Sequence, residues 1–425
     1  MMDEQMQEQQ ARYAELLIKL GVNLQPGQSL RVSGELAHAE FVRQVVAQAY
    51  QAGARYVQMD WIDAPTAHAR LANSQPDYLD YFPDYEVARH HQMVDETWAR
   101  LSLVGPAYPH AFDDLDPAVM QRASRARRTK LDFYMQAVMS NQLQWCVAGV
   151  PTRAWASEVY PDLSVEEALD ALWRIVLQTC RVDRPDPIAA WERHDHNLKS
   201  ITRFMDEQQI RAVRYLDATT GPDGKPNTDL TVGLTDHPNW IAASSQTPAG
   251  VHFMANMPTE EVFSTPHRLR TEGWVRTSKP TFPFQRMVDG AYFRFEQGEM
   301  VEYRAEVGQD VLDEFFTNEG ARRLGEVSLV DERSPINQAG VIFHEILFDE
   351  NAVSHIAFGQ AYPEGVVGGD ALDQAEYEAM GINESKVHVD FMIGTATMNV
   401  IGIRADGGEV LVMENGQFVA DALSE

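Results

Sequence analysis

The chain contains 425 residues, of which 44% are hydrophobic and 23% are charged, as in ordinary globular proteins. Its length predicts two domains. The formal net charge of −28 at pH 7 argues against nucleic acid or an anionic membrane as a partner, because either would require a basic surface. The same charge is typical of a soluble acidic surface, which attracts cations such as metal ions and free amino groups.

Neither the cysteines nor the first residues indicate export. Cys146 and Cys180 lie in apolar stretches and are expected to be buried, reduced thiols. The opening residues, MMDEQMQEQQ, are acidic and polar, whereas a signal peptide is basic and then apolar. No apolar run approaches the roughly 18 residues that a membrane-spanning helix needs. We therefore expect a cytoplasmic protein.

The first half of the chain alternates helical patterns with short strands. Apolar residues at helical spacing predict a helix over 13–20 that ends at Gly21, and another over 41–49 that ends at Gly53. Strands are expected at 29–33, 56–60, 100–104 and 144–147. Because this β-α-β order is typical of parallel sheets, residues 1–190 are predicted to form an α/β domain.

Two long helices, expected at 165–180 and 188–207, lead into a region of short strands. In this region Gln297-Gly298, Asp406-Gly407 and Asn415-Gly416 each separate two β-like runs, as hairpin turns do. Residues 191–425 are therefore predicted to form a mixed α+β domain that is largely antiparallel.

The residues that could bind a metal ion are concentrated in this second half of the chain. They lie in segments 256–266, 320–326, 347–351, 354–362 and 387–391. On a strand, His388 and Asp390 would share one face, and an imidazole beside a carboxylate suits a divalent metal. Taken alone, each segment also has an ordinary structural interpretation. His388 and Asp390 could form a surface ion pair, Glu326 could pair with a neighbouring arginine, and His355 could be a core histidine. Glu350 could lie at a helix N-terminus.

Five strings carry a resemblance to a known family: NMPTEEVFSTP, GARRLGEV, LFDENA, HIAFGQAY and HVDFMIG. Their order and separation resemble those of the thermophilic metallo-aminopeptidases, peptidase family M29 of the aminopeptidase T and aminopeptidase S type. The resemblance covers nearly the whole chain. It implies a homodimer that removes N-terminal residues from peptides, using water activated by two divalent metal ions (Zn, Co, Mn or Mg).

The resemblance also assigns roles to residues. The metal ligands that it implies are Glu260, Glu326, Glu350, His355, His388 and Asp390. Tyr362 matches a tyrosine that the family places beside the metals, and it is expected to stabilise the developing oxyanion. Glu261, the second acid of the PTEE motif, is the expected proton-transfer residue.

Other functions are weighed against this one. A related non-haem iron ring-cleaving dioxygenase would normally need two histidines and one carboxylate around one metal, and the fuller acidic set favours hydrolysis. A non-catalytic acidic binding protein is disfavoured because all six implied ligands are present. Motifs of serine hydrolases, P-loop NTPases and zincins are missing from the sequence. The histidines of His194-Asp195-His196 and His90-His91 are expected to be surface residues.

Overall fold

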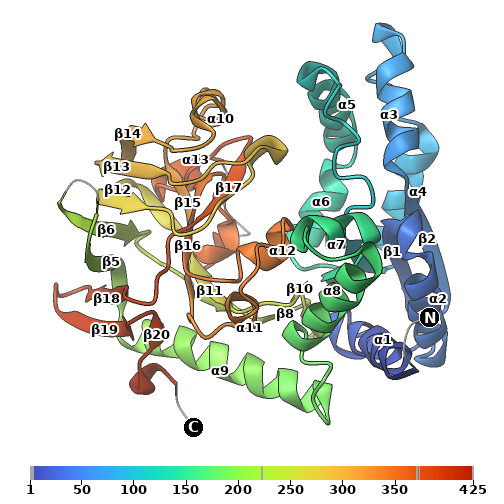
Figure 1. The fold of residues 1–425 in the computed structure, drawn as a ribbon, viewed down its shortest axis with the longest axis horizontal. Helices are drawn as coiled ribbons and strands as arrows, with labels where there is room; N and C mark the ends of the chain where they lie inside the picture. Colours follow the sequence, from blue (N-terminus) through green and yellow to red (C-terminus); the bar gives the residue numbers. More distant parts are fainter. Residues whose placement is uncertain (1–3, 222–223, 370–371, 373, 424–425) are drawn as a thin grey trace. The chain divides into compact units, whose positions relative to one another are not determined.

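A computed structural model describes residues 4–221, 224–369, 372 and 374–423 (Figure 1). The chain divides into two compact units, each built from three separate stretches of the sequence. The N-terminal unit comprises Met1–Trp191, Ser244–Pro258 and Phe343–Leu347. The C-terminal unit comprises Glu192–Ala243, Thr259–Ile342 and Phe348–Glu425. The domain limits expected from the sequence, 1–190 and 191–425, stay a prediction.

The N-terminal unit is built on a five-stranded parallel sheet in the order β10-β4-β3-β1-β2. Its strands are β1 (Ser29–Glu35), β2 (Tyr56–Ile62), β3 (Ala99–Val104), β4 (Trp145–Gly149) and β10 (Asn256–Met257). Leu30 and Val32 alternate along β1 and are fully buried, which is the pattern that predicted this strand. A parallel sheet with helical connections confirms the α/β class of the first half.

Helices precede, connect and follow strands β1 to β4 (Figure 1). They are α1 (Glu4–Leu16), α2 (Ala39–Gln51), α3 (Ala64–Asn73), α4 (Asp84–Asp95), α5 (Pro117–Lys130), α6 (Asp132–Met139), α7 (Arg153–Val159) and α8 (Val165–Thr179). The expected cap at Gly21 is wrong, because α1 continues as a π-helical turn, Leu17–Gly21, whose C-cap is Val22. Gly53, in contrast, follows α2 with a positive φ of 92°, as a helix-terminating glycine does.

The C-terminal unit contains two antiparallel sheets. The eight-stranded sheet has the order β14-β13-β12-β6-β5-β18-β19-β20, and the five-stranded sheet has the order β17-β16-β15-β11-β7. The strands of the larger sheet are β5 (Ile210–Thr220), β6 (Pro226–Leu234), β12 (Pro266–Arg276), β13 (Tyr292–Glu296), β14 (Glu299–Arg304), β18 (Asn399–Arg404), β19 (Glu409–Glu414) and β20 (Gln417–Phe418). The strands of the smaller sheet are β7 (Ile241–Ala242), β11 (Glu261–Ser264), β15 (Leu324–Val330), β16 (His355–Gly359) and β17 (His388–Met392).

The remaining elements are short, except for the long helix α9. They are α9 (Pro187–Glu207), α10 (Gln309–Phe315), α11 (Pro335–Gln338), α12 (Ile346–Asp349), α13 (Gln374–Ala379) and the two-stranded pair β8 (Ser244–Gln246) and β9 (His252–Met254). The three predicted turns all join neighbouring strands of the larger sheet. At two of them, Gln297-Gly298 and Asn415-Gly416, both residues have positive φ, as type I′ hairpin turns require.

An aromatic core joins the two antiparallel sheets. The ring of Phe293 on β13 lies 4.9 Å from that of Phe358 on β16 and 5.0 Å from that of Phe391 on β17, between ring centroids. All three side chains are fully buried. Edge-to-face aromatic pairs of this kind add roughly 0.5–1.5 kcal/mol each to the burial of their area. The core therefore holds one face of the smaller sheet in place and leaves its other face available for polar residues.

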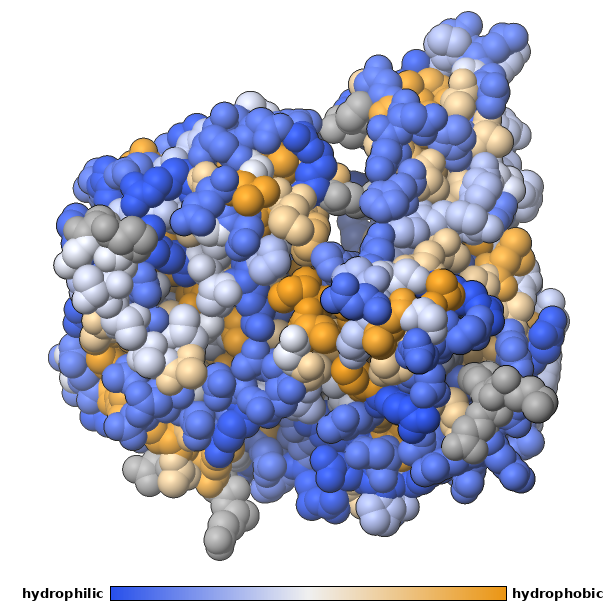
Figure 2. Space-filling view, viewed as in Figure 1, coloured by the Kyte–Doolittle hydropathy of each residue, from blue (hydrophilic) through white to orange (hydrophobic). Residues whose placement is uncertain are grey.

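Two further expectations concern the cysteines and the membrane. Cys146 and Cys180 are both buried and do not form a disulfide. Across the described residues, no helix has both the length and the apolar character needed to cross a membrane. Hydrophilic residues cover most of the face seen in Figure 2, with smaller hydrophobic patches between them.

Candidate metal centre

Four neighbouring strands of the smaller sheet bring four of the six candidate ligands, together with Glu261, to one face. Glu261 opens β11, Glu326 lies on β15, His355 opens β16, and His388 and Asp390 lie on β17. The antiparallel register pairs Asp390 with Ala357, two residues after His355. Because alternate side chains on a strand point to opposite faces, these polar residues share one face while Phe358 and Phe391 enter the core on the other.

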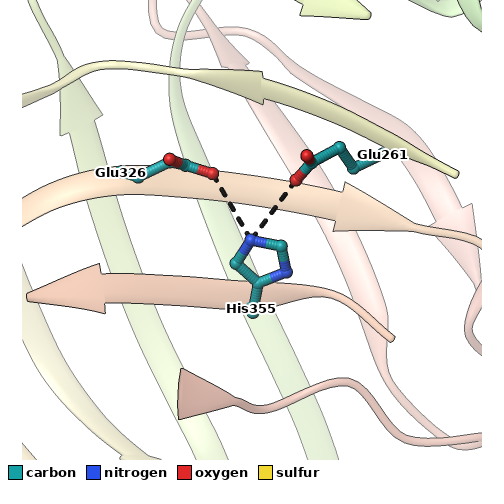
Figure 3. A group of neighbouring side chains, drawn as sticks. All are labelled: Glu261, Glu326 and His355. Atoms are coloured by element: carbon teal, nitrogen blue, oxygen red, sulfur yellow. Dashed lines mark hydrogen bonds and ion pairs between the residues drawn. The ribbon is translucent and has the colours of Figure 1, made fainter. Parts of the chain in front are cut away.

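His355 lies between two carboxylates (Figure 3). Its Nε2 is 3.3 Å from Oε1 of Glu326 and 3.4 Å from Oε2 of Glu261. The side chain of His355 is 1% exposed, and both acids are buried as well. One imidazole and two carboxylates whose donor atoms all lie within 4.8 Å of one another form a set that can hold a cation.

A second group shares Glu326 with the first. His388 Nε2 is 3.6 Å from Oε2 of Glu326 and 3.3 Å from Oδ1 of Asp390. Thus one oxygen of Glu326 faces His355, and the other faces His388. The predicted common face of His388 and Asp390 is confirmed by this contact.

Burial and neighbouring charges shift the pKa values of these groups. Burial raises the pKa of Glu261, and the negative charge of Glu326 raises it further, to about 7. Burial alone would lower the pKa of His355, but its carboxylate neighbours raise it to about 9. Burial likewise opposes the charged form of His388, yet Asp390 and Glu326 raise its pKa to about 10. The acids of this site therefore strongly favour a positive charge between them.

The donor set fits divalent cations. The Nδ1 of His388 donates to the carbonyl oxygen of Gln360 at 2.7 Å, which leaves its Nε2 directed at Glu326 and Asp390. A histidine ligand of a metal typically donates its other ring N–H to a carbonyl or carboxylate in this way. Three buried carboxylates in close proximity also repel one another, and a bound cation would relieve that repulsion.

Tyr362 lies beside His388 of the second group. Its ring centroid is 4.8 Å from that of His388 and 6.4 Å from that of Phe263. Burial raises the pKa of Tyr362 well above its ordinary value, and Glu326, Asp390, Glu350 and Glu261 raise it further, in that order. The Tyr362 hydroxyl therefore remains protonated, and able to donate, over the whole neutral range.

Glu260 and Glu350 belong to neither of the two groups. Glu260 Oε2 is 3.5 Å from Nε2 of His194, and its backbone N–H donates to Oδ1 of Asn351 at 2.7 Å. Glu350 accepts a hydrogen bond from Nδ2 of Asn351 on its Oε1, at 3.4 Å. The structure thus brings together Glu261, Glu326, His355, His388 and Asp390. It places Glu260 and Glu350 around Asn351.

The structure corrects two of the alternative interpretations. Glu326 lies on a strand and contacts histidines, while the neighbouring Arg323 pairs with Glu299 at 3.0 Å. Glu350 follows the C-terminal end of α12 and does not lie at a helix N-terminus.

The expectation that His194 and His90 are surface residues is also wrong. The side chain of His194 is 12% exposed, and its Nε2 donates to the carbonyl oxygen of Thr259 at 2.8 Å. His90 is 2% exposed. A signal for His194 was present in the sequence, because it recurs with Trp191, Leu198 and Ile201 at the 3–4-residue spacing of the buried face of α9.

The chain is similar to known proteins over nearly its whole length. The family model of the thermophilic metalloprotease (M29) matches residues 6–418. Aminopeptidase T of Thermus aquaticus is 38% identical over 409 residues, covering 96% of this chain and 98% of that protein. Aminopeptidase 2 of Geobacillus stearothermophilus is 36% identical over 408 residues, covering 96% of this chain and 97% of that protein.

A solved structure, wild-type AmpT from Thermus thermophilus, superposes with a TM-score of 0.88 at 37% identity. The match covers 97% of this chain and 99% of that one. The predicted fold class, an α/β first half followed by a largely antiparallel second half, is confirmed by this similarity.

Proposed function

This chain belongs to the M29 family of thermophilic metalloproteases, and from that premise we propose that it is a metal-dependent aminopeptidase that hydrolyses N-terminal residues from peptides. The observation that carries the proposal is the position of Glu326. Its two carboxylate oxygens face two different imidazoles, each with a further acid beside it. A carboxylate shared in this way suits a pair of divalent cations.

The proposed ligands are the six that the family resemblance implies. Glu326, His355, His388 and Asp390 are supported by the two groups on the smaller sheet. Glu260 and Glu350 are proposed as the ligands that complete the site. The cations would be Zn, Co, Mn or Mg. Bound there, they would lower the pKa of a water molecule and polarise the scissile carbonyl group.

The residues around this site would perform the remaining steps. The protonated Tyr362 hydroxyl would donate a hydrogen bond to the oxygen that becomes negatively charged during attack on the carbonyl. Glu261, held by a 3.0 Å hydrogen bond from Ser328 Oγ and lying 3.4 Å from Nε2 of His355, would accept and return a proton during the reaction. The dense acidic cluster would attract the free amino group of a peptide, which restricts cleavage to N-terminal residues.

Metal removal tests the proposal directly. Exhaustive chelation should abolish release of chromophore from aminoacyl anilides, and cobalt, zinc, manganese or magnesium should restore it. His388→Ala should bind less metal and lose activity while its circular dichroism spectrum is retained. Full activity of metal-free protein would contradict the proposal, and oxygen consumption with ferrous iron would indicate a ring-cleaving dioxygenase instead.

The cellular setting and assembly are proposed on the same basis. We expect a cytoplasmic protein with peptides as its substrates, and a homodimer. One chain has a mass of 47.9 kDa, so light scattering on the purified protein should give about twice that value. A mass equal to that of a single chain would contradict the dimer.

A further inference from the structure

Glu260 and Glu350 differ from the other proposed ligands in what holds them. Glu326, His355, His388 and Asp390 lie on paired strands, whose register sets their positions. Glu260 precedes β11 by one residue, and Glu350 follows the end of α12. Strand pairing therefore does not determine where these two carboxylates lie.

Both residues also follow points at which the chain passes between the two units. The segments Ser244–Pro258 and Phe343–Leu347 belong to the N-terminal unit, and the chain returns to the C-terminal unit at Thr259 and Phe348. Glu260 and Glu350 come one and two residues after these returns, respectively. A contact within the C-terminal unit must therefore fix them relative to each other.

Asn351 provides that contact. Its Oδ1 accepts the backbone N–H of Glu260 at 2.7 Å, and its Nδ2 donates to Oε1 of Glu350 at 3.4 Å. A primary amide suits this position because one of its atoms accepts hydrogen bonds and the other donates them. A single side chain thus joins the backbone of one proposed ligand to the carboxylate of the other.

The backbone of Asn351 is itself well fixed. The residue is 0% exposed, and its backbone N–H donates to the carbonyl oxygen of Phe348 at 3.0 Å. Its own carbonyl oxygen accepts a hydrogen bond from Ser334 Oγ at 2.8 Å. His194 of α9 donates from its Nε2 to the carbonyl oxygen of Thr259 at 2.8 Å, so both the carbonyl and the N–H of the Thr259–Glu260 peptide group are hydrogen-bonded.

We propose that Asn351 is the positioning residue that holds Glu260 and Glu350 in one arrangement, so that both carboxylates can complete the binding of the paired cations. The inference rests on the proposed metal-dependent function. It adds the residue that positions the two proposed ligands that do not lie on paired strands. Partners of this kind around a metal site typically contribute 10–100-fold to metal affinity.

Two substitutions distinguish the two hydrogen bonds of the Asn351 side chain, the one to the Glu260 backbone and the one to the Glu350 carboxylate. Asn351→Asp retains the size of the side chain and the acceptor for Glu260, but replaces the donor to Glu350 with an oxygen that repels it. Asn351→Ala removes both hydrogen bonds. Asn318→Ala is the control, because Asn318 is a half-buried asparagine whose Nδ2 donates to the carbonyl oxygen of Phe315 at 2.8 Å and to no proposed ligand or strand that carries one.

The measurement is titration of chelator-stripped full-length protein with Co²⁺, followed by calorimetry and by visible absorption of the bound ion. Wild type should bind two Co²⁺ per chain. Both Asn351 variants should bind at least one of these ions 10–100-fold more weakly and show an altered absorption spectrum. Asn318→Ala should lower the midpoint of thermal unfolding while retaining both Co²⁺ affinities.

The outcomes distinguish this inference from the proposed function. If wild type binds two Co²⁺ and Asn351→Asp binds them with unchanged affinity and spectrum, the positioning role is wrong and the function stands. If wild type binds no Co²⁺ and is active without metal, both are wrong. Because Asn351→Asp retains the side-chain volume, it decides the question even where Asn351→Ala fails to fold.

Discussion

Burial, and then the acids around it, set the protonation state of Tyr362. Its hydroxyl is kept protonated by burial and by four carboxylates, and it lies beside the proposed cation site. Tyr362→Phe should lower kcat about 100-fold, since removing one oxyanion donor typically has an effect of this size. Co²⁺ binding should be unchanged. Tyr303→Phe, whose hydroxyl donates to Asp313 at 2.9 Å elsewhere, is the control, and an unaltered kcat for Tyr362→Phe would remove this residue from the mechanism.

His38 is a buried histidine with a structural role far along the chain from the proposed ligands. Its Nδ1 accepts the backbone N–H of Glu35 at 3.2 Å, and its Nε2 donates to the carbonyl oxygen of Gly105 at 3.0 Å. The neutral ring satisfies both contacts, whereas a protonated ring would lose the first. Burial accordingly lowers the pKa of His38 from 6.5 to about 4.

This lowered pKa predicts a loss of stability in acid. The unfolded chain takes up the proton near pH 6.5, but the folded chain resists it until about pH 4. The stabilisation is therefore complete above pH 6.5 and is lost as the pH falls to 4, by about 3 kcal/mol in total. In urea unfolding between pH 7 and 4, the free energy of unfolding of His38→Gln should depend less steeply on pH than that of wild type. The exposed His196→Gln should retain the wild-type dependence, and identical slopes for all three proteins would contradict the prediction.

Among the secondary-structure elements, the β16–β17 pair aligns the two histidines of the site. Gly359 on β16 is the register partner of His388 on β17. It has a positive φ of 104°, and a Cβ added to it would lie 2.0 Å from the carbonyl oxygen of Val387. No residue with a side chain can occupy this position without displacing the strand that carries His388.

Gly359→Ala should therefore lower the free energy of unfolding by about 3 kcal/mol, through backbone strain and overlap together. It should also weaken Co²⁺ binding, because His388 moves with its strand. Gly407→Ala is the control: Gly407 also has a positive φ, 83°, but a Cβ there meets no atom within 4 Å, so it should cost about 1 kcal/mol and leave metal binding intact. Urea unfolding measures the free energy of unfolding of both variants, and Co²⁺ titration measures their metal affinity. An equal loss of unfolding free energy in the two variants would contradict the clash at Gly359.

Across the whole molecule, the net charge of −28 should influence which peptides are captured. A strongly acidic protein attracts cationic ligands over long distances, and salt screens this attraction, since the Debye length falls from about 30 Å at 0.01 M to about 8 Å at 0.15 M. Over that range kcat/KM for a lysyl anilide should fall more steeply than kcat/KM for a leucyl anilide, which has one positive charge fewer. Parallel salt dependences of the two substrates would show that the overall charge has no such role.

Much of this molecule follows from local sequence patterns. Alternation of apolar residues indicated β1, the 3–4-residue spacing indicated α8 and α9, and glycine-containing dipeptides marked the hairpin turns. The common face of His388 and Asp390 was also predictable, because it depends on a single strand. The resemblance to the M29 family, which extends over nearly the whole chain, added the set of six candidate metal ligands.

The sequence by itself therefore determined most element types, the fold class and the common face of His388 and Asp390. Tertiary structure decided the rest: that Glu261 joins His355 and Glu326, that Glu260 lies against a half-buried His194, and that Asn351 links Glu260 to Glu350. The physical reason is one of range. Periodicity orients side chains within one element, whereas the neighbours of that element depend on pairing and packing between segments tens to hundreds of residues apart, which no local pattern encodes.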